Sequence, residues 1–396
     1  MSSGGLAGKP LEPSVLSEGF GMLRKLVGDL RAKGHQVTVP LDARISRLNP
    51  TLPADVVVPV FSIKEAETLI TDAAKNDVAS LIIAPETDRI LLSLVQLTVG
   101  NQHSLNCNPD AIAHTSDKTI LYAKLKNEGF AVPEAIKFDE DETIPGIRGA
   151  IGKNLDYPVI FKPSNGVSCG GVSLVKRSSQ IESALAKVKA QSKKFIVQKL
   201  ISGAAASVSL LCTGDKGLAI SLNQQSVTLA SPTENSRYEG GAVPFDHPLK
   251  HEAFITAERF AASLKGLRGY VGIDFVLGEE HPFIVDVNPR LTTSYVALSN
   301  VAGFSMAEAI INSALKNKLP EKPTTHGFAY FSKIETPAPN SCAFQKACQM
   351  EEVVSPPFPL DNNKKTFSLV LSSGNSCDTA RLKFEEAKKQ LLDIIR

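Results

Sequence analysis

The sequence predicts an α/β protein in which an N-terminal domain with a doubly wound parallel sheet precedes two α+β subdomains. Over about residues 1–110, short apolar runs alternate with amphipathic stretches, a pattern typical of parallel strands covered by helices. After residue 111, some apolar runs are joined by loops of under about a dozen residues, which are too short for a parallel crossover and indicate antiparallel strands. The length of 396 residues suits two or three domains.

The N-terminal domain is expected to begin with an amphipathic helix. Apolar residues recur at helical spacing from Leu16, at Phe20, Leu23, Val27 and Leu30, and the pattern stops at glycine 34. Further along, apolar runs predict strands over 36–42, 54–60 and 79–86, with helices over 63–77 and 87–100.

The second part, residues 111–205, is expected to contain a helix over 116–129 and a strand, glycine-rich loop and strand over 157–175. A helix over 179–191 and a strand over 195–201 follow. In the third part, residues 206–320, we expect strands over 207–213, 217–223, 269–277 and 282–288 around a helix over 252–266. The last part, residues 321–396, is expected to form a small α/β extension with strands over 327–335 and 366–372 and a terminal helix.

Composition excludes several classes of protein. With 43 Lys and Arg against 41 Asp and Glu, the net charge is only +2, so no broad basic surface for nucleic acid is expected. The six cysteines lack CxxC pairs, which argues against a disulfide framework and a zinc site. The N-terminus has no apolar signal core, and the longest apolar run, over 90–99, is about half of a membrane span. We therefore expect a cytoplasmic protein without membrane contact.

A glycine-rich loop, KPSNGVSCGG over 162–171, is the first candidate site. Its glycines could let backbone N–H groups approach phosphate oxygens closely, although an ordinary structural turn explains the same composition. The spacing is not that of a P-loop, and the loop joins two strands rather than opening a helix, so it is not a dinucleotide-binding motif either.

Two neighbouring strands, YVGIDFVL and PFIVDVNPR, each carry an acid inside an apolar run. Burying Asp274 and Asp286 side by side would be costly without a cation, and Mg²⁺ commonly binds one or two carboxylates together with substrate phosphates. Asn288 lies on the same strand face as Asp286, and Arg290 follows if the strand continues past Pro289. The pattern therefore predicts a metal–nucleotide site, with Arg290 contacting a phosphoryl group.

Two lysines are candidates for contacts to phosphate. Lys162 ends an apolar run, where an unpaired ammonium group is unexpected unless an anion binds there. Lys118 opens a predicted helix, where a solvated surface lysine is the ordinary alternative.

In this order, the motifs SDK, PVIFKPS with its glycine loop, FIVQKLISG, GIDF and IVDVNPR closely resemble the ATP-grasp superfamily over about residues 111–300. The resemblance implies the ATP-grasp fold, with ATP and Mg²⁺ (or Mn²⁺) as cofactors. It implies that Asp274, Asp286 and Asn288 hold the metal, and that Arg290 and Lys162 act in catalysis. The implied ATP contacts are Lys118, Lys162, Ser164, Gly166, Ser168, Gly170, Gly171, Gln198, Lys199 and Leu200.

Two positions depart from the superfamily pattern. Asp286 is shorter than the Glu that is common there, which leaves open whether one or two metal ions bind. Ala204 and Ala205 lie where many members place a ribose-binding Glu, so the ribose contact is unassigned.

Shorter stretches, namely SGG, LSEGFGMLRKL, APET and the loop over 223–244, are similar to the tyramine-glutamate ligase family of methanofuran-type cofactor biosynthesis. That resemblance implies an ATP-dependent carboxylate–amine ligase that joins the γ-carboxylate of glutamate to a primary amine, with small-molecule acid and amine substrates. Candidate substrate contacts are Glu18, Glu86, Arg237 and Tyr238; a helix cap or a surface ion pair is the alternative for each.

Other functions stay open. A different ATP-grasp ligase, or a carboxylase, would use another acid and acceptor, although no MKM-like biotin segment is present. A nucleotide-binding regulator is a third alternative, but it would not need the complete set of Lys162, Asp274, Asp286, Asn288 and Arg290. A homodimer is a possible assembly.

Overall fold

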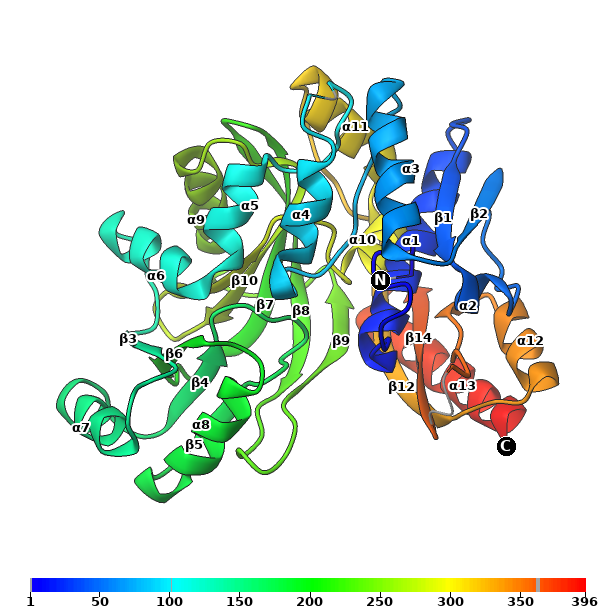
Figure 1. Ribbon diagram of the computed structural model, residues 1–396. Coiled ribbons are helices and arrows are strands. Elements are labelled where there is room, and N and C mark those ends of the chain that lie inside the picture. Colours follow the sequence, from blue (N-terminus) through cyan, green and yellow to red (C-terminus); the bar gives the residue numbers. More distant parts are fainter. Residues whose placement is uncertain (1, 101, 361–363) are drawn as a thin grey trace.

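A large antiparallel sheet forms the centre of the computed structural model, which describes residues 2–100, 102–360 and 364–396 (Figure 1). It has eight strands in the order β11-β10-β7-β8-β9-β12-β14-β13. The strands are β7 (Ala204–Thr213), β8 (Gly217–Thr228), β9 (Arg237–Val243), β10 (Arg268–Leu277), β11 (Pro282–Asn288), β12 (Phe328–Pro337), β13 (Val353–Ser355) and β14 (Lys365–Gly374). The strands predicted around residues 207–288 are confirmed, whereas β9 was not predicted.

A second, four-stranded sheet in the order β3-β6-β4-β5 carries the glycine-rich loop between its last two strands. Its helices α7 and α8 pack on it, and stacked rings of Phe138, Phe161 and Phe195 fill its core. The antiparallel pairing of β4 with β5 confirms the predicted strand–loop–strand unit. The elements are α6 (Lys118–Asn127), β3 (Ala135–Asp139), α7 (Ile144–Asn154), β4 (Val159–Pro163), β5 (Ser173–Val175), α8 (Ile181–Lys189) and β6 (Lys194–Lys199).

The N-terminal region has a parallel pair of strands, β1 (Thr38–Asp42) and β2 (Val56–Val60). The predicted third strand over 79–86 is wrong, since only an isolated bridge between Ser80 and Ser104 forms there. The buried side chain of Asn106 takes the place of a neighbouring strand. Its Oδ1 accepts a hydrogen bond from the Ile82 N–H, and its Nδ2 donates to the Ile82 carbonyl, each at 2.8 Å. The helices here are α1 (Pro13–Arg31), α2 (Ala43–Ser46), α3 (Ile63–Lys75), α4 (Ile90–Gln96) and α5 (Pro109–Ser116).

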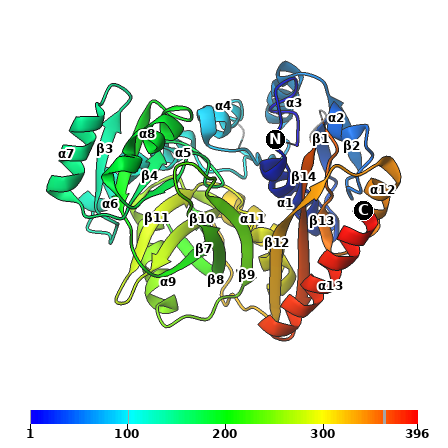
Figure 2. The same ribbon diagram turned by 90° about the horizontal axis from the view of Figure 1, so that it is seen from below.

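Helix α1 begins at Pro13, earlier than predicted, because the Glu12 carboxylate accepts the N–H groups of Ser14 and Val15. It packs on β13 and β14, and Figure 2 shows it beside β14. Gly21 permits this approach, since a Cβ atom at this position would lie 2.7 Å from Leu369 of β14. The N-terminal helix α1 and the C-terminal strands β13 and β14 therefore pack together.

The C-terminal strands extend the central sheet, because β12 pairs with β9 across the expected boundary at residue 320. The predicted strands over 327–335 and 366–372 correspond to β12 and β14, and the terminal helix is confirmed as α13. The remaining helices are α9 (Lys250–Ser263), α10 (Tyr295–Val301), α11 (Met306–Lys316), α12 (Ser341–Gln349) and α13 (Cys377–Ile395), of which α10 to α12 were not predicted.

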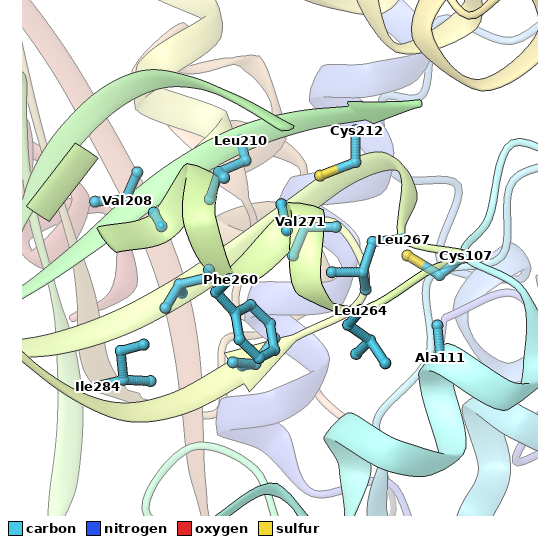
Figure 3. Close-up of a cluster of buried hydrophobic side chains, with 14 of the residues drawn as sticks. Cys107, Ala111, Val208, Leu210, Cys212, Phe260, Leu264, Leu267, Val271 and Ile284 are labelled. Atoms are coloured by element: carbon cyan, nitrogen blue, oxygen red, sulfur yellow. The ribbon is translucent and has the colours of Figure 1, made fainter. Parts of the chain in front are cut away.

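The main hydrophobic core lies between the central sheet and helices α5 and α9 (Figure 3). Cys107 and Cys212 lie in this cluster with Phe260 and Val271, and all six cysteines are free thiols. Burial raises the pKa of Cys107 to about 12, so this thiol packs as an apolar group. In the part of the chain that the structure describes, no helix has the length and apolar character required to span a membrane.

Candidate functional site

A cavity of about 580 Å³ lies where the two sheets meet. It falls in the size range of small-molecule sites. Strands β4, β6, β10 and β11 contribute to its wall, and so does the loop over 164–172. We call this loop the flap. Many predicted ATP and metal contacts line the cavity: Lys118, Lys162, Gly166, Ser168, Gly170, Gln198, Lys199, Leu200, Asp274, Asp286, Asn288 and Arg290.

The two aspartates lie opposite each other on adjacent antiparallel strands. Asp274 of β10 pairs in register with Asp286 of β11, and a β-bulge follows Asp274. Like charges placed opposite each other destabilise a sheet, and bulges are frequent beside active sites. The paired acids are therefore a feature that a bound cation would explain.

Neighbouring side chains hold Asp274 in place. Its carboxylate accepts hydrogen bonds from Gln225 Nε2 at 2.9 Å and Asn288 Nδ2 at 3.1 Å. Burial and the adjacent Asp286 nevertheless raise the pKa of Asp274 to about 6. Burial disfavours the charged carboxylate, and the Asp286 charge repels it. Gln225 of β8 was not predicted, because a lone Gln on a strand carries no sequence signal.

Lys118 contacts the acidic pair directly. It is the first residue of α6, its N–H donates to Ser164 O at 2.7 Å, and its Nζ lies 2.7 Å from Asp286 Oδ2. Burial lowers the pKa of this lysine, but the charge and hydrogen bond of Asp286, together with the charges of Glu86 and Asp274, outweigh burial and raise it. Lys118 is thus a charged group inside the cavity and not a solvated surface residue.

Lys162 lies on β4 beneath the flap. Burial lowers the pKa of its ammonium group, and Asp286 opposes this effect only in part. Among the described residues, no carboxylate lies within ion-pair distance of Lys162. A buried lysine without a partner is unfavourable unless an anion joins it. The position therefore suits a phosphate group.

Strand β6 adds a polar group at the junction of the sheets. Gln198 is buried, and its Oε1 atom has no hydrogen-bond partner within the described ranges. Such an unpaired acceptor suits a ligand donor such as an exocyclic amine. Lys199 and Leu200 follow it along the cavity wall.

Residues 115–294 match the model of the ATP-grasp domain, and residues 35–112 match that of the pre ATP-grasp 3 domain. The chain belongs to the ATP-grasp superfamily. It is an ATP-dependent ligase. Its ATP-grasp fold has a pre-ATP-grasp domain that precedes the four-stranded and eight-stranded sheets.

Individual relatives refine the comparison. The chain is 28% identical, over 67% of its length and 77% of the relative's, to a tyramine–L-glutamate ligase of Methanocaldococcus fervens. A putative ATP-grasp superfamily protein from Archaeoglobus fulgidus is 25% identical in sequence, with a TM-score of 0.61, covering 92% of this chain and 96% of that one. An N5-carboxyaminoimidazole synthetase from Staphylococcus aureus, complexed with ADP, shares the fold at 13% identity and a TM-score of 0.70, covering 93% of this chain and 94% of that one.

In this ATP-grasp protein, Arg290 does not extend strand β11, because the strand ends at Asn288. Its guanidinium instead donates to Glu86 Oε2 at 2.8 Å and to Leu291 O at 3.0 Å. Arg290 Nε and Glu86 Oε1 are both buried without partners among the described residues. The ion pair therefore keeps one free donor and one free acceptor beside the cavity.

The remaining predicted residues lie in different surroundings. Tyr238 lines the cavity, and burial raises its pKa well above the usual value. Ser164 is buried against Ser192 and does not line the cavity. Gly171 lies near the end of the flap in a left-handed conformation, with φ of 74°. Arg237 is exposed and does not line the cavity, so the structure does not bring it to the site.

Glu18 of α1 does line the cavity, and its carboxylate already has protein partners. One of them, Lys333 of β12, was not predicted as a site residue. It lies far from the ATP-grasp motifs in sequence, and only the pairing of β12 with β9 brings it close.

Proposed function

We propose that this protein is a carboxylate–amine ligase that activates an acid as its acyl phosphate and then forms an amide. One observation carries the proposal: two opposed carboxylates and a half-buried lysine, which has no ion-pair partner among the described residues, share one cavity beneath a glycine-rich flap. Such a set suits the positioning and charge stabilisation on which phosphoryl transfer depends. A nucleotide-binding regulator would need neither the opposed acids nor Arg290 at the same place.

The donor set fits Mg²⁺. Asp274 and Asp286 offer hard oxygen ligands, and the Asn288 amide adds a neutral one. Within the described ranges no group of three or more His, Cys, Asp or Glu side chains could hold a metal. When bound, the ion would neutralise phosphate charge, and Mn²⁺ could replace it.

The protein's own cations would act on the transferred group. Lys162 and Lys118 would bind phosphate oxygens, and Arg290, which keeps a free Nε donor, would stabilise charge on the phosphoryl group in transit. Gln198 would contact adenine, with Lys199 and Leu200 beside it. The flap, including Gly166 and Gly170, would cover the phosphates and exclude water from the acyl phosphate.

For the substrates, we propose the γ-carboxylate of glutamate and tyramine or a similar amine, in the biosynthesis of a methanofuran-type cofactor. The likeness to the tyramine–L-glutamate ligase of M. fervens supports this pair of substrates. Tyr238, which lines the cavity, is a candidate contact for an aromatic ring. Glu86 is buried against Arg290 and does not line the cavity, so its predicted contact with a substrate is not supported by its place in the fold.

A second candidate keeps the activation of a carboxylate by ATP but changes both the acid and the acceptor. It is favoured by a relative of Streptomyces coelicolor, 25% identical over 54% of this chain, which is a putative D-alanine–D-lactate ligase and would use a hydroxyl acceptor. A homodimer remains a prediction.

The test is ADP and phosphate release from Mg-ATP with glutamate, with and without tyramine, tyrosine and a panel of other amines. Mass spectrometry identifies the product. Amine-dependent release with a γ-glutamyl amide would support the proposal. Turnover only with another acid would replace the substrate assignment, and tight Mg-ATP binding without turnover on any pair would refute the ligase.

A further inference from the structure

A buried ion pair links three distant segments of the chain beside the cavity. Lys333 Nζ of β12 lies 2.5 Å from Glu18 Oε1 of α1. The side chains of Glu18 and Lys333 are only 9% and 7% exposed, respectively. Ser168, at the tip of the flap, donates to the same carboxylate, at 3.1 Å to Oε1 and 3.3 Å to Oε2. A single carboxylate thus connects the N-terminal helix, the C-terminal strands and the flap.

The Glu18 carboxylate accepts from three donors in this arrangement. Besides Ser168 and Lys333, Thr293 Oγ1 donates to Oε2 at 2.9 Å. A carboxylate accepts about four hydrogen bonds, so these three donors occupy most of its acceptor sites. Lys333 is held in turn by a 2.7 Å bond to Ser14 Oγ. The network therefore ties the flap to both ends of the fold through Glu18.

The flap needs such a contact to hold its shape. Ser168 and Cys169 have left-handed backbone conformations, with φ of 50° and 63°, which are unfavourable for residues other than glycine. Two backbone bonds within the loop, Gly170 N to Val167 O and Val172 N to Cys169 O, support the turn. Among the side-chain bonds of the described residues, the bond to Glu18 ties Ser168 to the other side of the cavity.

Lys333 does not line the cavity, whereas Glu18 and Ser168 do. We propose that Lys333, acting through Glu18, is a positioning residue that latches the flap over the reacting acyl group. The inference rests on the proposed ligase function, to which it adds a role for the C-terminal strands.

The latch would protect the acyl phosphate from water. If water enters, its oxygen attacks the acyl carbon, the bond from that carbon to the phosphate oxygen breaks, and the acid and inorganic phosphate are released while a proton passes to solvent. One ATP is then consumed without an amide. Opening the latch should therefore raise the amount of phosphate released per amide formed.

Two variants break the latch at different ends. Ser168→Ala removes the donor on the flap, and Lys333→Met removes the cation that holds Glu18. Ser168→Asn is the conservative variant, because Asn tolerates the left-handed conformation and its amide can donate a hydrogen bond. The matched control is Lys365→Met, which removes a Lys–Glu pair between Lys365 of β14 and the exposed Glu335 of β12.

The measurement is the ratio of phosphate to amide at saturating substrates. We expect a ratio near one for the wild type and Lys365→Met, a several-fold higher ratio for Ser168→Ala and Lys333→Met, and partial recovery for Ser168→Asn. An ion pair with a purely structural role would lower stability in Lys333→Met without changing the ratio. Equal ratios in all variants would overturn the latch.

Hydrogen–deuterium exchange of residues 164–172 separates failure of the latch from failure of the ligase assignment. In the presence of Mg-ADP, the two latch variants should exchange this segment several-fold faster than the wild type and Lys365→Met. This result would support the latch even if the wild type forms no amide with any substrate pair. Equal exchange in the wild type and both latch variants would refute the latch, whatever the activity.

Discussion

The raised pKa of Asp274 leads to a quantitative prediction about stability. The Asp274→Asn variant replaces the carboxylate by a neutral side chain of nearly the same shape. In the metal-free protein, the wild-type carboxylate is destabilised by burial and by Asp286. We therefore expect the variant to lose less stability than the wild type as the pH rises from 4 to 7.

The size of the effect follows from linkage. The Asp274 pKa is about 6 in the folded protein, against a usual value of 3.8. Because the folded state binds the proton more tightly, protonation of Asp274 stabilises the fold fully below about pH 3.8, and this contribution is lost as the pH rises through 6. The difference between the two pKa values corresponds to about 3 kcal/mol.

The assay is urea unfolding of the wild type and the variant, followed by far-UV circular dichroism, at several pH values between 4 and 8 with a chelator present. Subtracting the two proteins cancels the contributions of other titrating groups. The variant should gain up to about 3 kcal/mol relative to the wild type between the lowest and highest pH. Parallel pH profiles would refute the conclusion that the folded protein destabilises this charge.

Three other substitutions test the site and the core. Asp286→Asn should lower phosphate release from Mg-ATP by about 10²-fold or more, because it removes one of the two opposed carboxylates and the 2.7 Å partner of Lys118. Lys162→Met should raise the KM for ATP by about tenfold, which corresponds to one charged phosphate contact. Phe161→Ala, in the stacked core of the flap-bearing sheet, should cost about 3–5 kcal/mol in urea unfolding. Unchanged phosphate release, KM or unfolding free energy, respectively, would contradict each assignment.

Local patterns in the sequence predicted much of the site. Strands β10 and β11 follow from apolar runs, and an acid inside each run marks the pair that the register of β10 and β11 brings face to face. The flap was predicted from the glycines that lie between two short apolar runs. These features depend on neighbouring residues, so they can be read from the sequence.

The errors come from side-chain contacts between residues that are far apart in the sequence. Residues 79–86 have the composition of a strand, but the Asn106 side chain bonds the Ile82 backbone, and a contact 24 positions away has no periodic signature. Arg290 was expected on the end of β11, yet its position is set by Glu86, 204 residues away in sequence.

The sequence by itself determined the fold class, the order of the ATP-grasp motifs and the identity of the acidic pair, because strand periodicity and glycine content act over a few residues. Only the tertiary structure decided which groups share the cavity. Gln225 reaches Asp274 through the pairing of β7 with β8 and β10, and Lys333 reaches Glu18 because β12 joins the central sheet while α1 packs across β14. Such contacts depend on how buried apolar faces pack, and a single polar residue gives no sign of where its strand will lie.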